Sequence, residues 1–250
     1  MAGYVWEKSY PPGVKWDIEI PRKGLHEILI ESAATYGDKP LVDFFDKVLS
    51  FRQIDQLSSQ CAHGLQKLGV KPGVHVGLYL PNSPHYLIGF FGILKAGGTV
   101  VNYSPLDAER ELEHKIEDSQ TDILITLDVA ALYPKMQKML GKTRLKKLVV
   151  GSIADYLPWP KNWLYPIAKK KELSTWPRDD KHMSFKELIS GPADYQKHPV
   201  PQDIWDAVCV LQYTGGTTGL PKAAMLTHGS IMSAMTQGSE WTNPYTTPGT

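Results

Sequence analysis

Apolar positions near the start of the chain recur at the spacing of a helix that buries one face. The first such stripe, with intervals of three or four residues, runs through Leu25, Ile28, Leu29 and Ala33. Gly37 follows where this helix would end, because glycine readily adopts the backbone conformation that closes a helix. The next apolar stretch, 41–45, has the length of a short strand. The pattern therefore predicts a helix and then a strand.

A second helix is marked by its start as well as by its apolar stripe. Ser50 and Gln53 form a capping-box pattern, in which the two side chains satisfy free N–H groups at the helix start. The apolar stripe then continues to Gly69 through Ile54, Leu57, Cys61, Leu65 and Leu68. Because Cys61 lies on this stripe, we expect it to pack in the core.

Strands and helices then alternate up to about residue 150. Strands are predicted at 74–80, 99–102, 123–126 and 145–150. Helices are predicted from Ser83 and Pro84 to Gly97 and Gly98, at 108–118 and at 129–140. Such alternation with short connections is typical of a largely parallel sheet with helices on both faces. The predicted fold class is therefore α/β.

The alternation breaks between 152 and 201, where prolines are frequent and aromatic residues surround a run of lysines, 169–171. A loop or a peripheral insertion is expected there. Regular structure is predicted again as a strand at 205–211, a strand at 223–226 and a helix at 229–241 that Thr227 caps. The chain thus divides into an N-terminal extension (1–24), a first α/β subdomain (25–151), the insertion (152–201) and the start of a second α/β subdomain (202–250).

Composition narrows the classes of protein that fit. The 250 residues carry a formal net charge of +1, which is too small to attract nucleic acid. The two cysteines, Cys61 and Cys209, lie far apart, which suits a reducing compartment. Residues 1–10 lack the apolar core of a secretory signal, and no apolar stretch approaches the roughly 20 residues that span a bilayer. We expect a cytoplasmic protein without a nucleic-acid partner.

The segment 213–222 has the residue types of a loop that holds phosphate groups. Phosphate oxygens are best bound by converging backbone N–H groups, supported by hydroxyls and a cation. The segment begins at Tyr213 and supplies glycines for close backbone approach at Gly215, Gly216 and Gly219, hydroxyls at Thr214, Thr217 and Thr218, and a cation at Lys222. All of these are candidate nucleotide-binding residues, and Thr214 and Lys222 are the candidate catalytic residues.

Other interpretations of this segment fit less well. In the P-loop pattern GxxxxGK[ST] the lysine directly follows glycine, whereas Leu220 and Pro221 stand before Lys222 here. Ala223 also replaces the hydroxyl residue of that pattern, and the chain after Lys222 favours a strand over a helix. A surface hairpin loop rich in turn-forming residues is the remaining alternative.

The segment Tyr213–Lys222 resembles the signature phosphate loop of the AMP-forming acyl-CoA synthetase superfamily. A second segment, 94–106, resembles the upstream motif of that superfamily, and His114 and Asp118 lie in matching surroundings. The resemblance implies the N-terminal part of the acyl-CoA synthetase fold. It also implies a two-step reaction: a carboxylate attacks ATP to give acyl-AMP and pyrophosphate, and the thiol of coenzyme A then takes the acyl group, with Mg²⁺ beside the phosphates.

Within the superfamily, the loop and the segment 156–176 look most like those of bacterial long-chain fatty acid–CoA ligases, which implies a fatty acid as the substrate. In that family the adenine and ribose contacts and a C-terminal catalytic lysine lie downstream of the loop. The chain up to Thr250 is therefore expected to be inactive alone. A medium-chain, aryl or amino acid as substrate, or a non-catalytic nucleotide- or lipid-binding module, remains an alternative, and a homodimer remains open.

Three further features allow a functional and a structural interpretation. The segment Trp159–Trp176 joins aromatic residues to the lysine run, which suits peripheral contact with anionic lipids on the inner face of a membrane; packing on its own domain is the alternative. Lys95, before two glycines, is interpreted as the cationic last turn of a helix. His228 is interpreted as a helix-start or surface histidine rather than a ligand contact.

Overall fold

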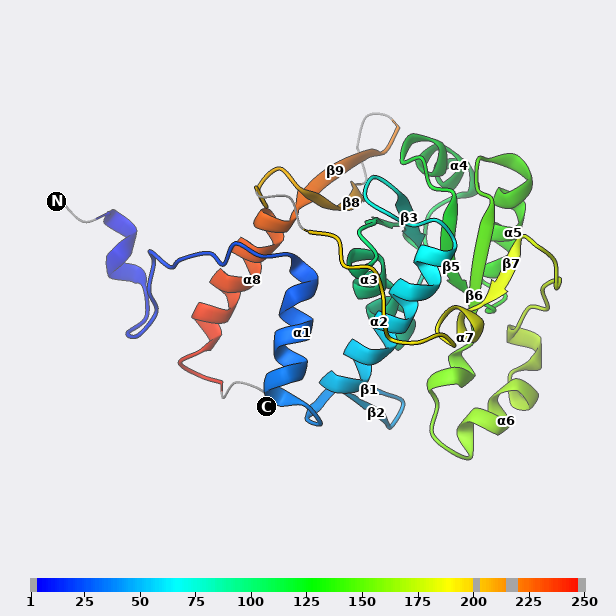
Figure 1. The fold of residues 1–250 in the computed structure, drawn as a ribbon, viewed down its shortest axis with the longest axis horizontal. Coiled ribbons are helices and arrows are strands. Elements are labelled where there is room, and N and C mark those ends of the chain that lie inside the picture. Colours follow the sequence, from blue (N-terminus) through cyan, green and yellow to red (C-terminus); the bar gives the residue numbers. More distant parts are fainter. Residues whose placement is uncertain (1–3, 200–202, 215–219, 247–250) are drawn as a thin grey trace.

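The centre of the molecule is a seven-stranded sheet (Figure 1) with the strand order β7-β6-β5-β3-β4-β8-β9. The structure is a computed structural model that describes residues 4–199, 203–214 and 220–246. The strands are β3 (His75–Leu78), β4 (Thr99–Asn102), β5 (Ile123–Leu127), β6 (Lys147–Gly151), β7 (His182–Ser184), β8 (Val208–Thr214) and β9 (Lys222–Thr227). Every neighbouring pair is parallel except β8 and β9. The predicted α/β class with a largely parallel sheet is confirmed.

Helices lie on both faces of this sheet, and the strand order explains why. The helices of the main α/β unit are α1 (Leu25–Tyr36), α2 (Phe51–Lys67), α3 (Pro84–Lys95), α4 (Glu109–Asp118), α5 (Tyr133–Lys142) and α8 (His228–Thr242). The chain moves one way along the sheet from β3 to β4, and the other way from β4 to β5. Because crossovers between parallel strands are right-handed, this reversal puts α3 and α4 on opposite faces.

Local sequence signals explain where several helices begin. Ser50 Oγ accepts a hydrogen bond from the Gln53 N–H (3.3 Å), and Gln53 Oε1 accepts one from the Ser50 N–H (2.9 Å). The predicted capping box at the start of α2 is therefore confirmed. Thr227 Oγ1 likewise accepts the Ser230 N–H at the start of α8. Ser83 does precede α3, but its side chain makes no capping hydrogen bond.

The predicted strand at 41–45 is only half of what the structure contains. Strands β1 (Pro40–Phe44) and β2 (Lys47–Ser50) pair antiparallel as a hairpin. Phe45 and Asp46 form its turn with φ values of 51° and 73°. Left-handed turn positions usually carry glycine or asparagine, so a turn made of Phe and Asp gives no sequence signal.

The insertion at 152–201 is more regular than predicted. It contains the short 3₁₀ turns η2 (Ile153–Tyr156) and η3 (Lys170–Glu172), the helices α6 (Lys161–Ala168) and α7 (Phe185–Leu188), and strand β7. Because β7 pairs parallel with β6, the expectation of a loop or a peripheral insertion is wrong for His182–Ser184. A strand of this length is too short to show a period of alternating residues.

Two predicted boundaries also shift by a few residues. Helix α5 begins at Tyr133 rather than at 129, because Pro134 occupies its first turn, where proline is tolerated. Strand β8 begins at Val208 rather than at 205, because a turn occupies 204–206. The division of the chain into subdomains stays a prediction, although β8 lies directly beside β4 in one sheet.

Lys95 lies in the core rather than at the surface. Its side chain is fully buried, and its Nζ donates to Asp55 Oδ1 (2.6 Å), Ser58 Oγ (2.8 Å) and Ser59 Oγ (3.0 Å). Lys95 does lie in the last turn of α3, but its ammonium pairs with residues of α2. The interpretation of Lys95 as a cationic last turn is therefore incomplete. Helix α3 can approach α2 this closely because Gly92 has no Cβ; one added there would lie 2.6 Å from Cys61 Sγ, and Cys61 is buried as predicted.

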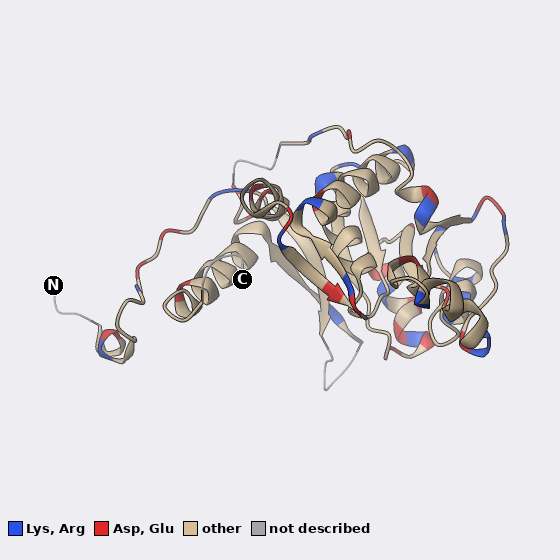
Figure 2. Ribbon diagram, turned by 90° about the horizontal axis from the view of Figure 1, so that it is seen from below, with Lys and Arg blue, Asp and Glu red and all other residues tan. Residues whose placement is uncertain are grey.

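Charged residues are distributed over many elements (Figure 2), as expected for a chain with almost no net charge. Helices α3 and α8 each carry a single charged residue, Lys95 and Glu240. Among the charged residues, the buried ones have the strongest effect on the local structure. Buried charges such as Lys95 and Lys115 need specific partners.

Candidate functional site

The predicted phosphate loop connects β8 to β9, and the structure describes both of its ends. Thr214 is the last residue of β8, Lys222 is the first of β9, and the two are directly paired across the hairpin. Directly paired residues of antiparallel strands direct their side chains to the same face. The two candidate catalytic residues are therefore neighbours at the mouth of the loop, and both are exposed. The candidates at 215–219, which are Gly215, Gly216, Thr217, Thr218 and Gly219, lie outside the described residues.

A hollow of about 780 Å³ adjoins the ends of the loop. Its polar lining consists of His114, Asp118, Ser119, Thr214 and Lys222, and Leu211 and Met225 are among its apolar lining residues. Strand β8 runs parallel to β4, so Thr214 stands at the carboxyl edge of the parallel strands. Ligands of open α/β sheets bind at this edge. The hollow thus has the position of a ligand site.

Tyr213 anchors the first end of the loop to α4. Its ring is buried, and its hydroxyl donates to Asp118 Oδ2 at 2.6 Å. Burial, and secondly the neighbouring Asp118 carboxylate, raises the pKa of the Tyr213 hydroxyl above its ordinary value. The hydroxyl therefore keeps its proton and remains a hydrogen-bond donor. Tyr213, predicted as a nucleotide-binding residue, supports the loop from below in this structure.

His114 anchors the second end of the loop to the same helix. Its Nε2 lies 3.1 Å from the backbone oxygen of Pro221. His114 and Asp118 are four residues apart on α4, so they lie on one face of the helix. Both residues lie in the stretch whose surroundings match the superfamily, but the sequence predicts no contact for either of them. Their spacing was the available signal, but it does not reveal a partner about a hundred residues away.

A buried charge pair lies beneath Tyr213. Lys115 Nζ is 2.7 Å from Asp107 Oδ1, and both side chains are nearly buried. The same ammonium lies 5.5 Å from the centre of the Tyr213 ring, within the range of a cation–π contact. The ring of Tyr103 stacks against the ring of Tyr213 at a centroid distance of 6.4 Å. These contacts give the base of the loop one well-defined position.

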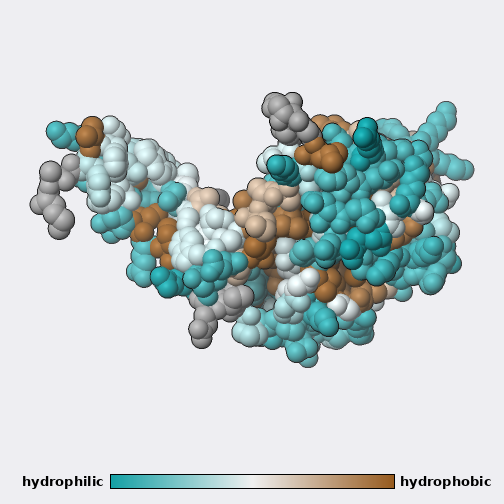
Figure 3. Space-filling view, turned by 90° about the horizontal axis from the view of Figure 1, so that it is seen from above, coloured by the Kyte–Doolittle hydropathy of each residue, from teal (hydrophilic) through white to brown (hydrophobic). Residues whose placement is uncertain are grey.

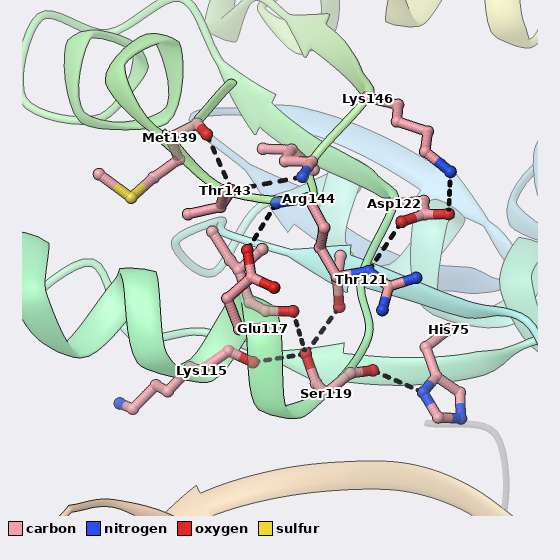
Figure 4. A network of polar contacts seen from close by, with 12 residues as sticks. His75, Lys115, Glu117, Ser119, Thr121, Asp122, Met139, Thr143, Arg144 and Lys146 are labelled. Atoms are coloured by element: carbon pink, nitrogen blue, oxygen red, sulfur yellow. Dashed lines mark hydrogen bonds and ion pairs between the residues drawn. The ribbon is translucent and has the colours of Figure 1, made fainter. Parts of the chain in front are cut away.

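The C-terminal end of α4 is itself fixed by a polar network (Figure 4). His75 Nδ1 donates to the Ser119 backbone oxygen at 2.6 Å. The Arg144 N–H donates to Glu117 Oε1 at 2.7 Å. Asp122 holds the side chains of Arg144 and Lys146, each at 2.9 Å, and its pKa is lowered because the hydrogen bonds and charges of these two cations outweigh the effect of its burial. Helix α4 is thus a rigid base for both ends of the loop.

The chain that leaves the loop is a strand, as the sequence predicts. Strand β9 follows Lys222, and α8 begins only at His228. A P-loop would place a helix N-terminus, with its partial positive charge, directly after the loop. In this chain the cationic contribution at the described end of the loop comes from the ammonium of Lys222. The geometry therefore separates this loop from the P-loop class.

Apolar side chains are also exposed near the loop. Leu220 and Met225 are 60% and 71% exposed, and apolar surface is visible on the face seen from above (Figure 3). Together with the polar groups of α4, they give the hollow a mixed lining. Such a lining suits a ligand with an anionic part and a flat or apolar part.

His228 is a structural residue at the start of α8, as interpreted from the sequence, but it is buried rather than exposed. Its Nδ1 accepts a hydrogen bond from the Leu25 N–H at 3.0 Å, which ties α8 to α1. An acceptor nitrogen must be unprotonated. Burial, and secondly the charge of His26, lowers the pKa of His228 to about 4.

Stability is expected to fall as the pH falls from about 6.5 towards 4. The pKa of His228 is near 6.5 in the unfolded chain and about 4 in the folded protein, so the unfolded state binds more protons in this interval. Thermal unfolding midpoints measured across this interval test the expectation. His228→Asn keeps an acceptor that does not titrate, and we expect a flatter profile for it; an unchanged slope would contradict the assignment to His228.

Comparison with protein families gives one match over most of the chain. A model described as AMP-binding enzyme matches residues 29–248. This range includes the described ends of the loop, helix α4 and the seven strands of the sheet.

Relatives named long-chain-fatty-acid–CoA ligase come from several bacteria. A long-chain-fatty-acid–CoA ligase of Bacillus subtilis (strain 168) is 37% identical in an alignment of 245 residues that covers 94% of this chain and 42% of that protein. A ligase of the same name from Escherichia coli O157:H7 is 32% identical over 98% of this chain and 44% of its own length. The chain thus spans less than half the length of these relatives.

Solved structures show the same fold. A long-chain-fatty-acid–CoA ligase from Archaeoglobus fulgidus has a TM-score of 0.70 and 25% identity, over 92% of this chain and 41% of that one. A red-emitting luciferase from Phrixothrix hirtus has a TM-score of 0.69 over 90% of this chain and 39% of its own, at 19% identity, and so supports the fold alone.

Proposed function

Because this chain belongs to the family of AMP-binding enzymes, we propose that its protein is a long-chain fatty acid–CoA ligase of which the chain supplies one part. Such a ligase activates a fatty acid with ATP to acyl-AMP and pyrophosphate, and then forms the thioester with coenzyme A. The bacterial relatives that carry this name support the choice of substrate. The 4-coumarate–CoA ligase 1 of Petroselinum crispum is 29% identical over 91% of this chain, so an aryl acid is the second candidate for the substrate.

The pairing of Thr214 with Lys222 is the observation that carries the proposal. It brings a hydroxyl and an ammonium together at the carboxyl edge of the parallel strands, beside a hollow of about 780 Å³. In our proposal, the loop receives the β and γ phosphates of ATP. Lys222 opposes their charge, and Thr214 donates a hydrogen bond to a phosphate oxygen. Tyr213, Asp118 and His114 hold the two described ends of the loop in place.

Mg²⁺ enters this proposal as the counter-ion of ATP. The carboxylate that lines the hollow is that of Asp118, and its Oδ2 already accepts the Tyr213 hydroxyl. Among the described residues, no group of three or more His, Cys, Asp or Glu side chains could hold a metal ion. Magnesium in nucleotide enzymes often keeps several waters and binds mainly through phosphates, so a dedicated protein cage is not required.

The test is ATP–pyrophosphate exchange by the protein at the length of its relatives, with a panel of carboxylic acids. We expect palmitate or oleate to support exchange. Acyl-AMP forms only from an acid that is a substrate, and its reverse reaction with labelled pyrophosphate gives labelled ATP and the free acid. Exchange with 4-coumarate and none with the fatty acids would replace the proposed substrate by an aryl acid.

A non-catalytic nucleotide- or lipid-binding module is the alternative from another class. It predicts ATP binding without exchange for any acid in the panel. Measuring ATP binding by calorimetry on the same preparation therefore separates the two. Binding without exchange would overturn the ligase proposal while leaving the phosphate-binding role of the loop intact.

A further inference from the structure

Helix α6 contacts the short turns η2 and η3 but lies largely at the surface of the described chain. None of its residues is buried. Trp163 and Ile167 are 68% and 64% exposed, and Trp159, just before the helix, is 83% exposed. Single exposed apolar residues are ordinary, but several on one element mark an interaction surface.

The exposed apolar side chains share one side of the helix. Trp163 and Ile167 are four residues apart and therefore lie on the same face. Leu164, which is also exposed, is three residues before Ile167 and adjoins it on the helix surface. The apolar side chains thus form one continuous strip.

The turn of the β1–β2 hairpin lies beside the start of α6. Asp46, in the turn, makes an ion pair with Lys161 at the start of α6. Phe45, beside Asp46, is 64% exposed. Figure 1 shows the hairpin and α6 in the lower part of the molecule, with β9 in the upper part. We refer to Trp159, Trp163, Leu164 and Ile167 as the α6 surface.

Positive charge borders the α6 surface. Lys169, Lys170 and Lys171 follow the helix directly, and all three are exposed. Glu172 is the acidic residue beside them, and it pairs with Lys169 at 2.7 Å. The C-terminal end of the helix therefore presents an excess of ammonium groups next to exposed tryptophan and isoleucine.

We propose that the α6 surface docks the protein onto a membrane rich in anionic lipids. Tryptophan and lysine are the residues that favour the bilayer interface, since the indole ring sits at headgroup level and the ammonium attracts anionic headgroups. The main competitor is a protein partner. Lysine is depleted in protein–protein interfaces, so the run Lys169–Lys171 favours lipid.

The helix lies along the membrane rather than across it. No helix in the described part of the chain is long and apolar enough to span a bilayer. An α6 of 8 residues extends about 12 Å, whereas a hydrocarbon core is about 30 Å thick. A short helix with one apolar side and flanking lysines has the character of an interfacial anchor.

Co-sedimentation of the 250-residue chain with vesicles tests this proposal. We expect binding to phosphatidylcholine vesicles that contain phosphatidylglycerol, and much weaker binding to phosphatidylcholine alone. Binding is expected to weaken as salt is added, because ions screen the lysines. Each lysine near an anionic surface corresponds to about fivefold in binding, so K169Q/K170Q/K171Q is expected to bind at least tenfold more weakly.

A matched variant controls for net charge. K138Q/K142Q/K146Q removes the same charge from exposed lysines on α5 and at the approach to β6, and we expect it to keep most of the binding. W163S/I167S tests the apolar strip and is expected to reduce binding to anionic vesicles at least tenfold. Because both residues are exposed, the variant is expected to fold, which circular dichroism checks.

The outcomes separate clearly. Equal loss of binding in the two lysine triplets would show general charge attraction and overturn the proposal. Absence of wild-type binding to the anionic vesicles would overturn it as well, as would concentration-dependent self-association that W163S/I167S abolishes. None of these readouts depends on ligase activity, so the docking proposal and the proposed function fail independently.

Discussion

Replacing Lys222 by methionine is expected to reduce ATP–pyrophosphate exchange by about a hundredfold to a thousandfold in the protein at the length of its relatives. Lys222 supplies the ammonium at the described end of the loop, and no helix start follows it directly to share the charge of the phosphates. Removing one preorganised donor to developing charge costs about that factor in enzymes. Initial rates at saturating ATP and fatty acid measure the effect.

Lys142→Met is the matched control for this experiment. Lys142 is exposed on α5 and pairs with the exposed Glu113, so its loss is expected to leave exchange unchanged. Lys222→Arg keeps the charge in a wider group and is expected to retain more activity than the methionine variant. Full exchange by Lys222→Met, with fatty acid dependence intact, would remove Lys222 from the phosphate site.

Asp55→Ala is expected to lower the free energy of unfolding by about 3 kcal/mol. It leaves the Lys95 ammonium fully buried with hydroxyl and backbone partners but without its counter-charge. Burial already lowers the pKa of Lys95, and Asp55 opposes that shift. Breaking a buried ion pair on one side typically costs about 3–5 kcal/mol, and Asp55 is 28% exposed, so we expect the lower end. Urea unfolding followed by circular dichroism measures the change.

The double variant Asp55→Ala with Lys95→Met decides whether the uncompensated charge is the cause. We expect it to recover most of the lost stability, because an apolar side chain of similar length needs no counter-charge. Glu113→Ala, which breaks the exposed pair with Lys142, is expected to change stability by less than about 1 kcal/mol. A double variant as unstable as Asp55→Ala alone would indicate lost packing instead.

The main sheet was predictable because each of its longer strands is an apolar run between helix signals. Strand β4 was predicted with its observed bounds, and β5 ends only one residue further on. The β1–β2 hairpin was not predictable, because its turn places Phe45 and Asp46 at positive φ without glycine. Strand β7 is also too short for its period to be recognised.

The sequence predicted which residue types form the candidate site, but not the contacts that hold the ends of the loop against α4. Thr214 and Lys222 were selected by residue type, and the structure pairs them across the hairpin. The contact of Tyr213 with Asp118 joins residues far apart in the chain, and a single sequence carries no signal for such a pair. The same holds for Lys95, whose burial follows from the packing of α3 on α2 rather than from its own helix.

The position of β8 in the sheet has a consequence for the order of folding during synthesis. Val210 in β8 pairs with Val100 in β4, so a large part of the chain separates two adjacent strands. Strands β3 to β7 can assemble while the ribosome is still making later residues, because domains form as the chain emerges. The edge of β4 stays open until β8 arrives, and closing so long a loop is entropically costly. The phosphate loop is therefore added after strands β3 to β7, onto a base already formed by α4.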